Sequence, residues 1–422
     1  MNIARIAILG AFALVGLSLV LAWPRAEFIP ARSSAAWAPT PDNIARGAYL
    51  ARAGNCIGCH TVRGGPDYAG GRALDTPFGR FYSPNLTPDR ATGIGAWSAD
   101  DFWNALHNGI GRDGRLLYPS FPYPNYTRVT RADADALFAY FSSLAPRSQP
   151  NRPHELRFPY DQQAVLAGWR LLYFRPAVQE VAPSRDAAWN RGAYLVEGLG
   201  HCAACHSTRN RFGAPVNGLE GGLMATAGWY APSLSAHDEA GLKDWRRADI
   251  VALLGSGISP RGSATGPMAE VVARSLQHLT PSDLGAMADY LKTLPATQAA
   301  SPAVGAAPSQ QVLDTGRRIY EAHCAQCHGD DGRGQLPAYP PLAGNRAVTL
   351  TPAVNAIRMT VNGGFPPSTQ GNPRPYGMPP FGHELGDAEV AAVLTWIRSS
   401  WGNAAPPVSA VEVNRYRAVP LD

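Results

Sequence analysis

Apolar residues recur at helical spacing in three stretches that lie far apart along the chain. The stretches are 130–144 ("TRADADALFAYFSSL"), 280–294 ("TPSDLGAMADYLKTL") and 385–400 ("LGDAEVAAVLTWIRSS"). Apolar side chains three and four positions apart, with polar residues between them, predict an amphipathic helix in each stretch. Each of these helices also carries an aromatic residue at the corresponding place, namely Tyr140, Tyr290 and Trp396.

A shorter helical pattern with a glycine and an aromatic residue precedes each amphipathic helix. It reads "RGAYLARAGNC" from Arg46, "RGAYLVEGLGHC" from Arg191 and "TGRRIYEAHC" from Thr315. A glycine lets two helix backbones approach closely, so we expect each short helix to cross the amphipathic helix that closes its repeat. The pattern predicts three small all-α units in tandem.

Composition agrees with three folded units. A chain of 422 residues fits about three domains, and 45% hydrophobic with 16% charged residues is typical of a folded protein. The 43 glycines and 38 prolines indicate many turns and long irregular loops between the helices. The net charge of +5 is small, and the 37 basic residues, of which only Lys243 and Lys292 are lysines, are scattered. Nothing in this distribution indicates a nucleic-acid-binding surface.

The N-terminus is typical of a targeting segment. Arg5 precedes an apolar run over residues 6–23, which Pro24 and Arg25 follow. The run is long enough for a signal peptide and approaches the ~20 residues that span a bilayer, so it predicts export with either a cleaved signal or a membrane anchor.

All six cysteines fall in three Cys-x-x-Cys pairs, and a histidine follows each pair at once. The motifs are Cys56, Cys59 and His60, then Cys202, Cys205 and His206, then Cys324, Cys327 and His328. Two thiols on one helical turn can bond the two vinyl groups of a haem, while the next side chain ligates iron, and this spacing is the c-type haem attachment signal. Zinc would require four grouped ligands and no histidine beside every second cysteine. The sequence therefore predicts three covalently bound haem c groups.

A proline-bearing turn follows each motif. The turns are "YSPNLT" from Tyr82, "YAPSLS" from Tyr230 and, more loosely, "YPPLAG" from Tyr339. A backbone carbonyl in such a turn can accept the imidazole N–H of the haem-ligating histidine, which raises the basicity of that ligand. An ordinary turn role for these prolines is the alternative.

Methionine candidates for the sixth iron ligand occur in only two of the three repeats. Met268 and Met378 lie in Gly/Pro-rich loops ahead of a closing helix, where a thioether ligand of an electron-transfer cytochrome is expected. The chain from Asn2 to Leu223 has no methionine, and Phe121 stands at the corresponding place. The first iron could be five-coordinate, could hold water, or could take His107 or His154.

These features together resemble the triheme cytochrome c subunit of bacterial membrane-bound dehydrogenases. The resemblance runs from about Pro41 to Asn403 and includes "AGGRALDTPFGRFYSPNLTPDRATGIGAWSADDF", "FPYPNYTRVTRADADALFAYF", "GPMAEVV" and "MPPFG". It implies an all-α fold of three tandem class I cytochrome c domains with long Gly/Pro-rich loops, behind an N-terminal apolar helix. It also implies Met268 and Met378 as axial ligands, whereas Phe121 departs from the methionine of many relatives.

The resemblance implies a partner and a place as well. Such subunits pass electrons at the periplasmic face of the inner membrane, from a catalytic subunit with flavin, pyrroloquinoline quinone or molybdenum to ubiquinone or an oxidase. Phe121 favours the molybdenum branch. The chain has no nucleotide-binding glycine motif and no nucleophile elbow, so we expect substrate oxidation on a separate subunit. A free-standing carrier, or a haem enzyme with an open first haem, is the alternative.

The repeats define five segments. Residues 1–35 are the signal or anchor, 36–175 the first haem domain, 176–296 the second, 297–312 an Ala/Pro/Ser-rich linker, and 313–422 the third domain with a C-terminal tail.

Overall fold

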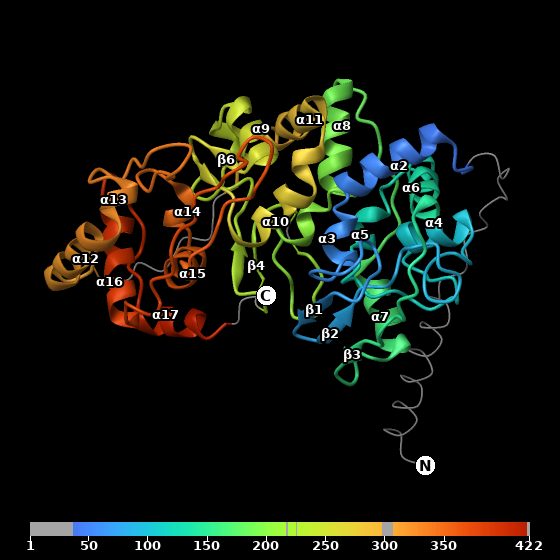
Figure 1. Ribbon diagram of the computed structural model, residues 1–422, viewed down its shortest axis with the longest axis horizontal. Helices are drawn as coiled ribbons and strands as arrows, with labels where there is room; N and C mark the ends of the chain where they lie inside the picture. The colour runs from blue at the N-terminus through green and yellow to red at the C-terminus, as the bar shows by residue number, and fades with distance from the viewer. Residues whose placement is uncertain (1–36, 217, 225, 298–306, 420–422) are drawn as a thin grey trace, which may run out of the picture. The chain divides into compact units, whose positions relative to one another are not determined.

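The computed structural model describes residues 37–216, 218–224, 226–297 and 307–419, and these are mostly helical (Figure 1). The predicted N-terminal apolar helix lies outside the described residues. No helix within the described ranges is long and apolar enough to cross a bilayer. The chain divides into two compact units, of which the first holds residues up to Ala51 with Cys59–Glu180 and the second holds Arg52–Gly58 with Val181–Asp422.

The first unit contains two crossed helices, several shorter helices and one small sheet. In chain order its elements are α2 (Pro41–Ala53), α3 (Cys56–His60), β1 (Ala73–Thr76), β2 (Gly79–Tyr82), α4 (Ala99–Asn108), α5 (Tyr123–Tyr126), α6 (Arg131–Ser143), β3 (Glu155–Leu156) and α7 (Gln163–Tyr173). The strands pair antiparallel in the order β1-β2-β3, with Ala73 opposite Tyr82 and Gly79 opposite Leu156.

The second unit repeats this plan twice. Its first part has α8 (Ala187–Ala193), η2 (Tyr194–Leu199), η3 (Cys202–Ala204), β4 (Gly222–Met224), β5 (Trp229–Ala231), η4 (Leu242–Asp244), α9 (Arg247–Ser256), β6 (Ile258–Ser259), β7 (Gly262–Ser263), α10 (Gly266–Arg274), η5 (Leu276–His278) and α11 (Pro281–Leu291). Its second part has α12 (Gln310–His323), α13 (Ala325–His328), α14 (Arg346–Thr349), α15 (Val354–Asn362), α16 (Asp387–Ser399) and α17 (Ala410–Arg417).

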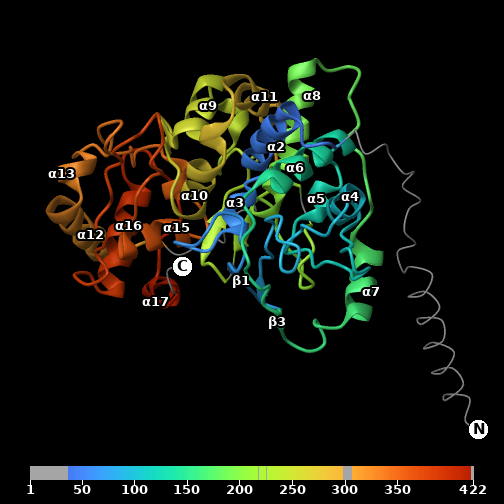
Figure 2. The same cartoon turned by 45° about the vertical axis from the view of Figure 1, so that its right-hand side comes forward.

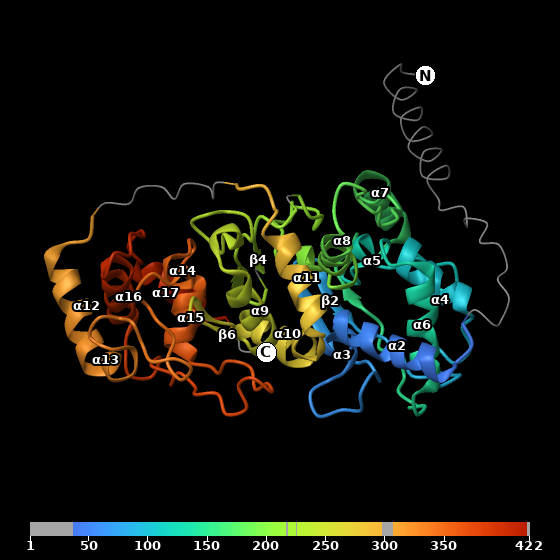
Figure 3. The same cartoon turned by 90° about the horizontal axis from the view of Figure 1, so that it is seen from above.

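The three predicted closing helices are α6, α11 and α16, and all three are confirmed. Thr130 and Thr280 cap the first two, because each hydroxyl accepts the backbone N–H three residues later, at 3.2 and 3.1 Å. The short helix of each repeat crosses its closing helix: α2 crosses α6 (Figure 2), α8 lies beside α11 (Figure 1), and α12 lies beside α16 (Figure 3).

A glycine sits at each of these crossings, as the sequence predicted. A Cβ atom built on Gly47, Gly192 or Gly316 would lie 2.6, 2.6 and 2.8 Å from a carbonyl carbon of the closing helix. The Cβ of Tyr140, Tyr290 or Trp396 would be 2.7–2.9 Å away. No side chain fits in that space, so glycine at these three positions sets the distance between the helices.

The small sheets correct the all-α expectation in part. Within the described chain β1, β2 and β3 form one antiparallel sheet, and β4–β5 and β6–β7 form two more. They lie in the Gly/Pro-rich loops that the sequence predicted as irregular. Strands of two to four residues are too short for an alternating pattern to be recognised, and their pairing satisfies the backbone groups of loops that lack helix.

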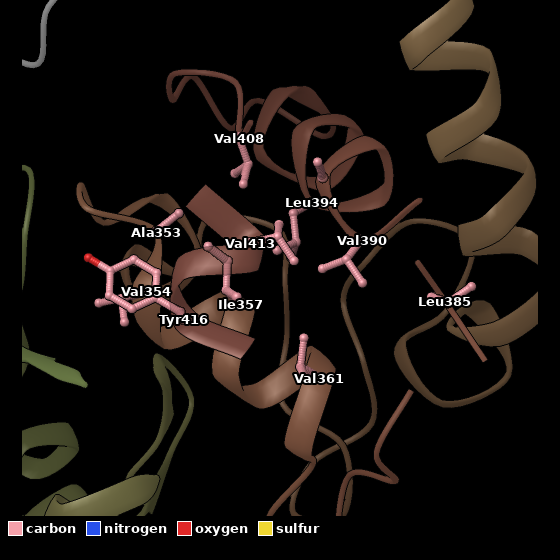
Figure 4. Close-up of a cluster of buried hydrophobic side chains, with 11 residues drawn as sticks. Ala353, Val354, Ile357, Val361, Leu385, Val390, Leu394, Val408, Val413 and Tyr416 are labelled. Atoms are coloured by element: carbon pink, nitrogen blue, oxygen red, sulfur yellow. The ribbon is translucent and has the colours of Figure 1, made fainter. Parts of the chain in front are cut away.

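The C-terminal tail packs onto the third repeat. α17 lies against α15 and α16, and Figure 4 shows the buried side chains that meet there, which include Val354, Ile357, Val390, Leu394, Val413 and Tyr416. Arg398 is 1% exposed and donates to the carbonyls of Val348, Leu350 and Pro406 at 2.6, 2.8 and 3.1 Å. One buried guanidinium thus ties the tail to the loop ahead of α15.

Candidate haem sites

Each Cys-x-x-Cys-His motif forms a tight helical turn directly after the first helix of its repeat. The turns are α3, η3 and α13. The N–H of His206 bonds the carbonyl of Cys202 at 2.9 Å, and the N–H of His328 bonds that of Cys324 at 3.0 Å. Such a turn brings both thiols and the imidazole to one side of the backbone, which suits attachment to the edge of a flat ligand.

The cysteines fit covalent attachment rather than cross-linking. The structure describes all six and joins none of them in a disulfide. Burial raises the pKa of Cys202 to about 12 and that of Cys324 to about 11, so both thiols are protonated at neutral pH. Thioether formation uses that S–H, since it adds across a vinyl double bond.

The three histidines are oriented by proline carbonyls. The Nδ1–H of His60 donates to Pro84 O at 2.8 Å. His206 makes the same bond to Pro232 O at 2.8 Å, and His328 to Pro340 O at 3.0 Å. This confirms that the turn carbonyls accept the imidazole N–H, and it leaves each Nε2 lone pair available to a metal.

Burial keeps these imidazoles neutral, which is the form that binds iron. It lowers the pKa of His60 from 6.5 to about 4, and it also lowers the pKa of His206 and His328. The proline carbonyl opposes this effect at each site because it stabilises the protonated ring. The donor set therefore fits a haem iron.

Three further glycines complete the sites, and sequence reasoning missed them. The N–H of Gly70, Gly221 and Gly334 donates to the carbonyl of His60, His206 and His328 at 2.8, 2.9 and 2.8 Å. All three have positive φ, at 77°, 86° and 61°. A Cβ on Gly70 would lie 2.6 Å from Pro84 O, and one on Gly334 would lie 2.6 Å from Pro340 O.

These glycines hold the proline turn against the attachment turn. They follow the histidine at different distances along the chain, so no constant spacing marks them in the sequence. Their common signal is a glycine between the motif and the proline turn, which a chain with 43 glycines does not make distinctive.

The candidate sixth ligands occupy different local settings. Met268 lies in the first turn of α10, directly after the β6–β7 hairpin. Met378 pairs through its backbone with Gly364, which follows α15. Met287 is 2% exposed in α11 and belongs to the core, as expected from the sequence.

The two histidines considered for the first iron both have Nδ1 engaged elsewhere. His107 Nδ1 lies 2.8 Å from Thr127 O, and the ring stacks on Trp103 with centroids 4.5 Å apart. His154 Nδ1 accepts the backbone N–H of Tyr82 at 3.2 Å. Phe121 has its ring 5.4 Å from that of Tyr126.

Comparison with known proteins assigns the class. The sequence profile of the cytochrome c family matches residues 44–145, 190–295 and 313–401, which we call cytochrome regions 1, 2 and 3. The chain therefore belongs to the cytochrome c family, and its domains imply covalently bound haem c.

The relatives are more specific. The chain is 39% identical to the gluconate 2-dehydrogenase cytochrome c subunit of Pantoea cypripedii, over 86% of each protein. It is 37% identical to the cytochrome c subunit of the quinone alcohol dehydrogenase of Komagataeibacter europaeus, over 90% of this chain and 86% of the relative. It is also 39% identical to a nicotinate dehydrogenase chain of Pseudomonas putida over 94% of its own length, but it spans only 34% of that longer protein.

Proposed function

We propose that this chain is a triheme electron-transfer subunit. One repeated observation supports this most strongly: three attachment turns, each with a histidine whose Nδ1–H donates to a proline carbonyl. Haem c supplies reversible one-electron chemistry at each site. Three such sites in one chain suit a relay of single electrons.

The chain's own residues divide the work at each site. Cys56 and Cys59, Cys202 and Cys205, and Cys324 and Cys327 would attach the three haems, and His60, His206 and His328 would ligate iron from one side. In regions 2 and 3, Met268 and Met378 would ligate from the other side and raise the reduction potential. The hydrogen bond from each histidine to a proline carbonyl would fix the ring orientation.

The electron donor in this proposal is a separate dehydrogenase catalytic subunit. The relatives are cytochrome subunits of gluconate, alcohol and fructose dehydrogenases, which supports such a partner here. Its cofactor would be flavin, pyrroloquinoline quinone or molybdenum. The complex would lie at the periplasmic face of the inner membrane and reduce ubiquinone or an oxidase.

The first experiment counts haems. We expect the tagged protein, purified from native membranes in mild detergent, to carry three haems per chain in a pyridine haemochrome assay with mass spectrometry. The pair Cys202→Ala and Cys205→Ala should lower the count to two, whereas Ser207→Ala beside the motif should leave three. A count unchanged by loss of the cysteine pair would refute the attachment assignment.

The same preparation tests the partner. A stoichiometric large subunit with flavin, quinone or molybdenum cofactor should co-purify with the cytochrome. If the protein repeatedly came out alone, and no dehydrogenase in the membrane fraction reduced its haems on addition of substrate, the subunit assignment would fail.

Methionine variants test the sixth ligands. Met268→Leu and Met378→Leu should each remove about half of the near-infrared band of methionine-ligated ferric haem, because two of the three haems would have this ligand. The buried Met287→Leu is the matched control and should leave the band unchanged, because its side chain lies in the core of α11. A band that survived both ligand variants intact would refute the assignment of Met268 and Met378.

A further inference from the structure

Phe121 stands in the same structural register as Met268. After α4 and after α9 the chain passes through a left-handed glycine, Gly109 or Gly257. It then turns back, so that Leu117 N–H donates to Gly109 O and Ala264 N–H donates to Gly257 O, both at 2.8 Å. Four residues beyond Leu117 lies Phe121, and four residues beyond Ala264 lies Met268.

The structure therefore puts a phenyl ring where region 2 has its thioether. A phenyl ring has no lone pair to give to a metal. The backbone N–H of Phe121 donates to Tyr118 O at 3.0 Å, which fixes this part of the loop. Tyr123 follows it, is fully buried, and lies beneath the guanidinium of Arg170, 5.1 Å from the ring centroid.

Other protein ligands for this iron are scarce. Region 1 contains neither methionine nor lysine. His107 is 5% exposed and is held between Trp103 and the Thr127 carbonyl. His154 receives the N–H of Tyr82, two residues before the proline whose carbonyl holds His60, and its ring lies against Phe81 at 5.2 Å. Burial raises the pKa of Tyr123 to about 12, which disfavours a phenolate ligand.

We infer that cytochrome region 1 gives its iron one protein ligand, His60, and leaves the opposite side open to a small uncharged ligand of the carbon monoxide type, with Phe121 as an apolar wall. The inference rests on the proposed function, because it requires a haem attached at Cys56 and Cys59. It makes region 1 a ligand-binding haem in a chain whose other two haems are closed by methionine.

The experiment uses the purified full-length chain and carbon monoxide as the probe. Haem is counted first, and then the dithionite-reduced protein is titrated with carbon monoxide while the Soret band is followed. We expect three haems and one bound carbon monoxide per chain, together with a high-spin ferric signal from one third of the iron by electron paramagnetic resonance.

Two exchanged variants make the test specific. Phe121→Met should abolish carbon monoxide binding and convert the high-spin signal to low-spin. Met268→Phe should raise the stoichiometry from one carbon monoxide to two. Phe121→Leu, which is apolar and cannot ligate, should still bind one, and it controls for general disturbance of the loop.

The failures of the two proposals can be told apart. Three haems with no bound carbon monoxide would overturn the inference and leave the triheme function standing. Carbon monoxide binding that appears only in His107→Ala or His154→Ala would also overturn it, because that result identifies a histidine ligand. A chain with no haem at Cys56 and Cys59 would refute the triheme function itself.

Discussion

Gly192 offers a direct test of how the helices of region 2 are held together. A Cβ atom at this position would lie 2.6 Å from the carbonyl carbon of Ala286 and 2.9 Å from the Cβ of Tyr290, both in α11. These are backbone and Cβ atoms, so no rotamer change can relieve the overlap, and α8 and α11 would have to separate. Arg191 resists that separation, because it donates to both carboxylate oxygens of Asp283 at 2.9 and 2.8 Å.

Two opposing effects set the size of the change. Alanine in place of a helical glycine stabilises the folded state by about 0.5–1 kcal/mol through the entropy of the unfolded chain. Overpacking against a fixed neighbour costs about 1–3 kcal/mol, and loss of helix contact adds to it. The net expectation for Gly192→Ala is a loss of about 1–2 kcal/mol, since the overlap falls on backbone. For a domain of roughly 100 residues each 1 kcal/mol lowers Tm by about 4–8 °C.

Differential scanning calorimetry and far-ultraviolet circular dichroism of the full chain would measure this. Gly218→Ala is the matched control, because a Cβ there meets no atom within 4 Å. We expect Gly192→Ala to lower the Tm of one transition and Gly218→Ala to leave it unchanged or slightly raised. If Gly192→Ala were as stable as the control variant, the argument that glycine sets the helix spacing would be wrong, and Gly47 and Gly316 would lose the same explanation.

Three further outcomes follow from named contacts. Asp283→Asn removes the carboxylate that Arg191 holds and should cost about 1–3 kcal/mol in urea unfolding, whereas Asp289→Asn, in a more exposed ion pair, should cost under about 1 kcal/mol. Burial raises the pKa of Glu239 above 4.5, so the folded state binds its proton more tightly than the unfolded chain and stability should fall as pH rises from 4.5 through the raised pKa. Glu239→Gln should flatten that part of the curve, and an unchanged slope would assign it to another group. Arg398→Met leaves three buried carbonyls without a donor and should cost about 2–4 kcal/mol; limited proteolysis would show whether the tail after α16 is cut faster than in wild type, and equal rates would refute its anchoring role.

Much of the fold was predictable because its signals are local. The closing helices α6, α11 and α16 were found from apolar spacing within single stretches of 13 or fewer helical residues. The glycines of the helix crossings were found because they recur at one place in a repeated motif. The small sheets were missed, since strands of two to four residues carry no periodic pattern.

The sequence by itself determined the attachment chemistry, because Cys-x-x-Cys-His keeps its two thiols and imidazole within one turn of chain. Only the tertiary structure decided what each imidazole bonds to, since the accepting proline carbonyl lies 24, 26 and 12 residues away in the three repeats. The same holds for Gly70, Gly221 and Gly334, whose bonds to the motif depend on how a loop returns and not on its length. It holds for Phe121 as well, whose register with Met268 rests on backbone bonds to Gly109 and Gly257. Covalent spacing is set along the chain, whereas backbone contacts between distant residues exist only once the chain has folded.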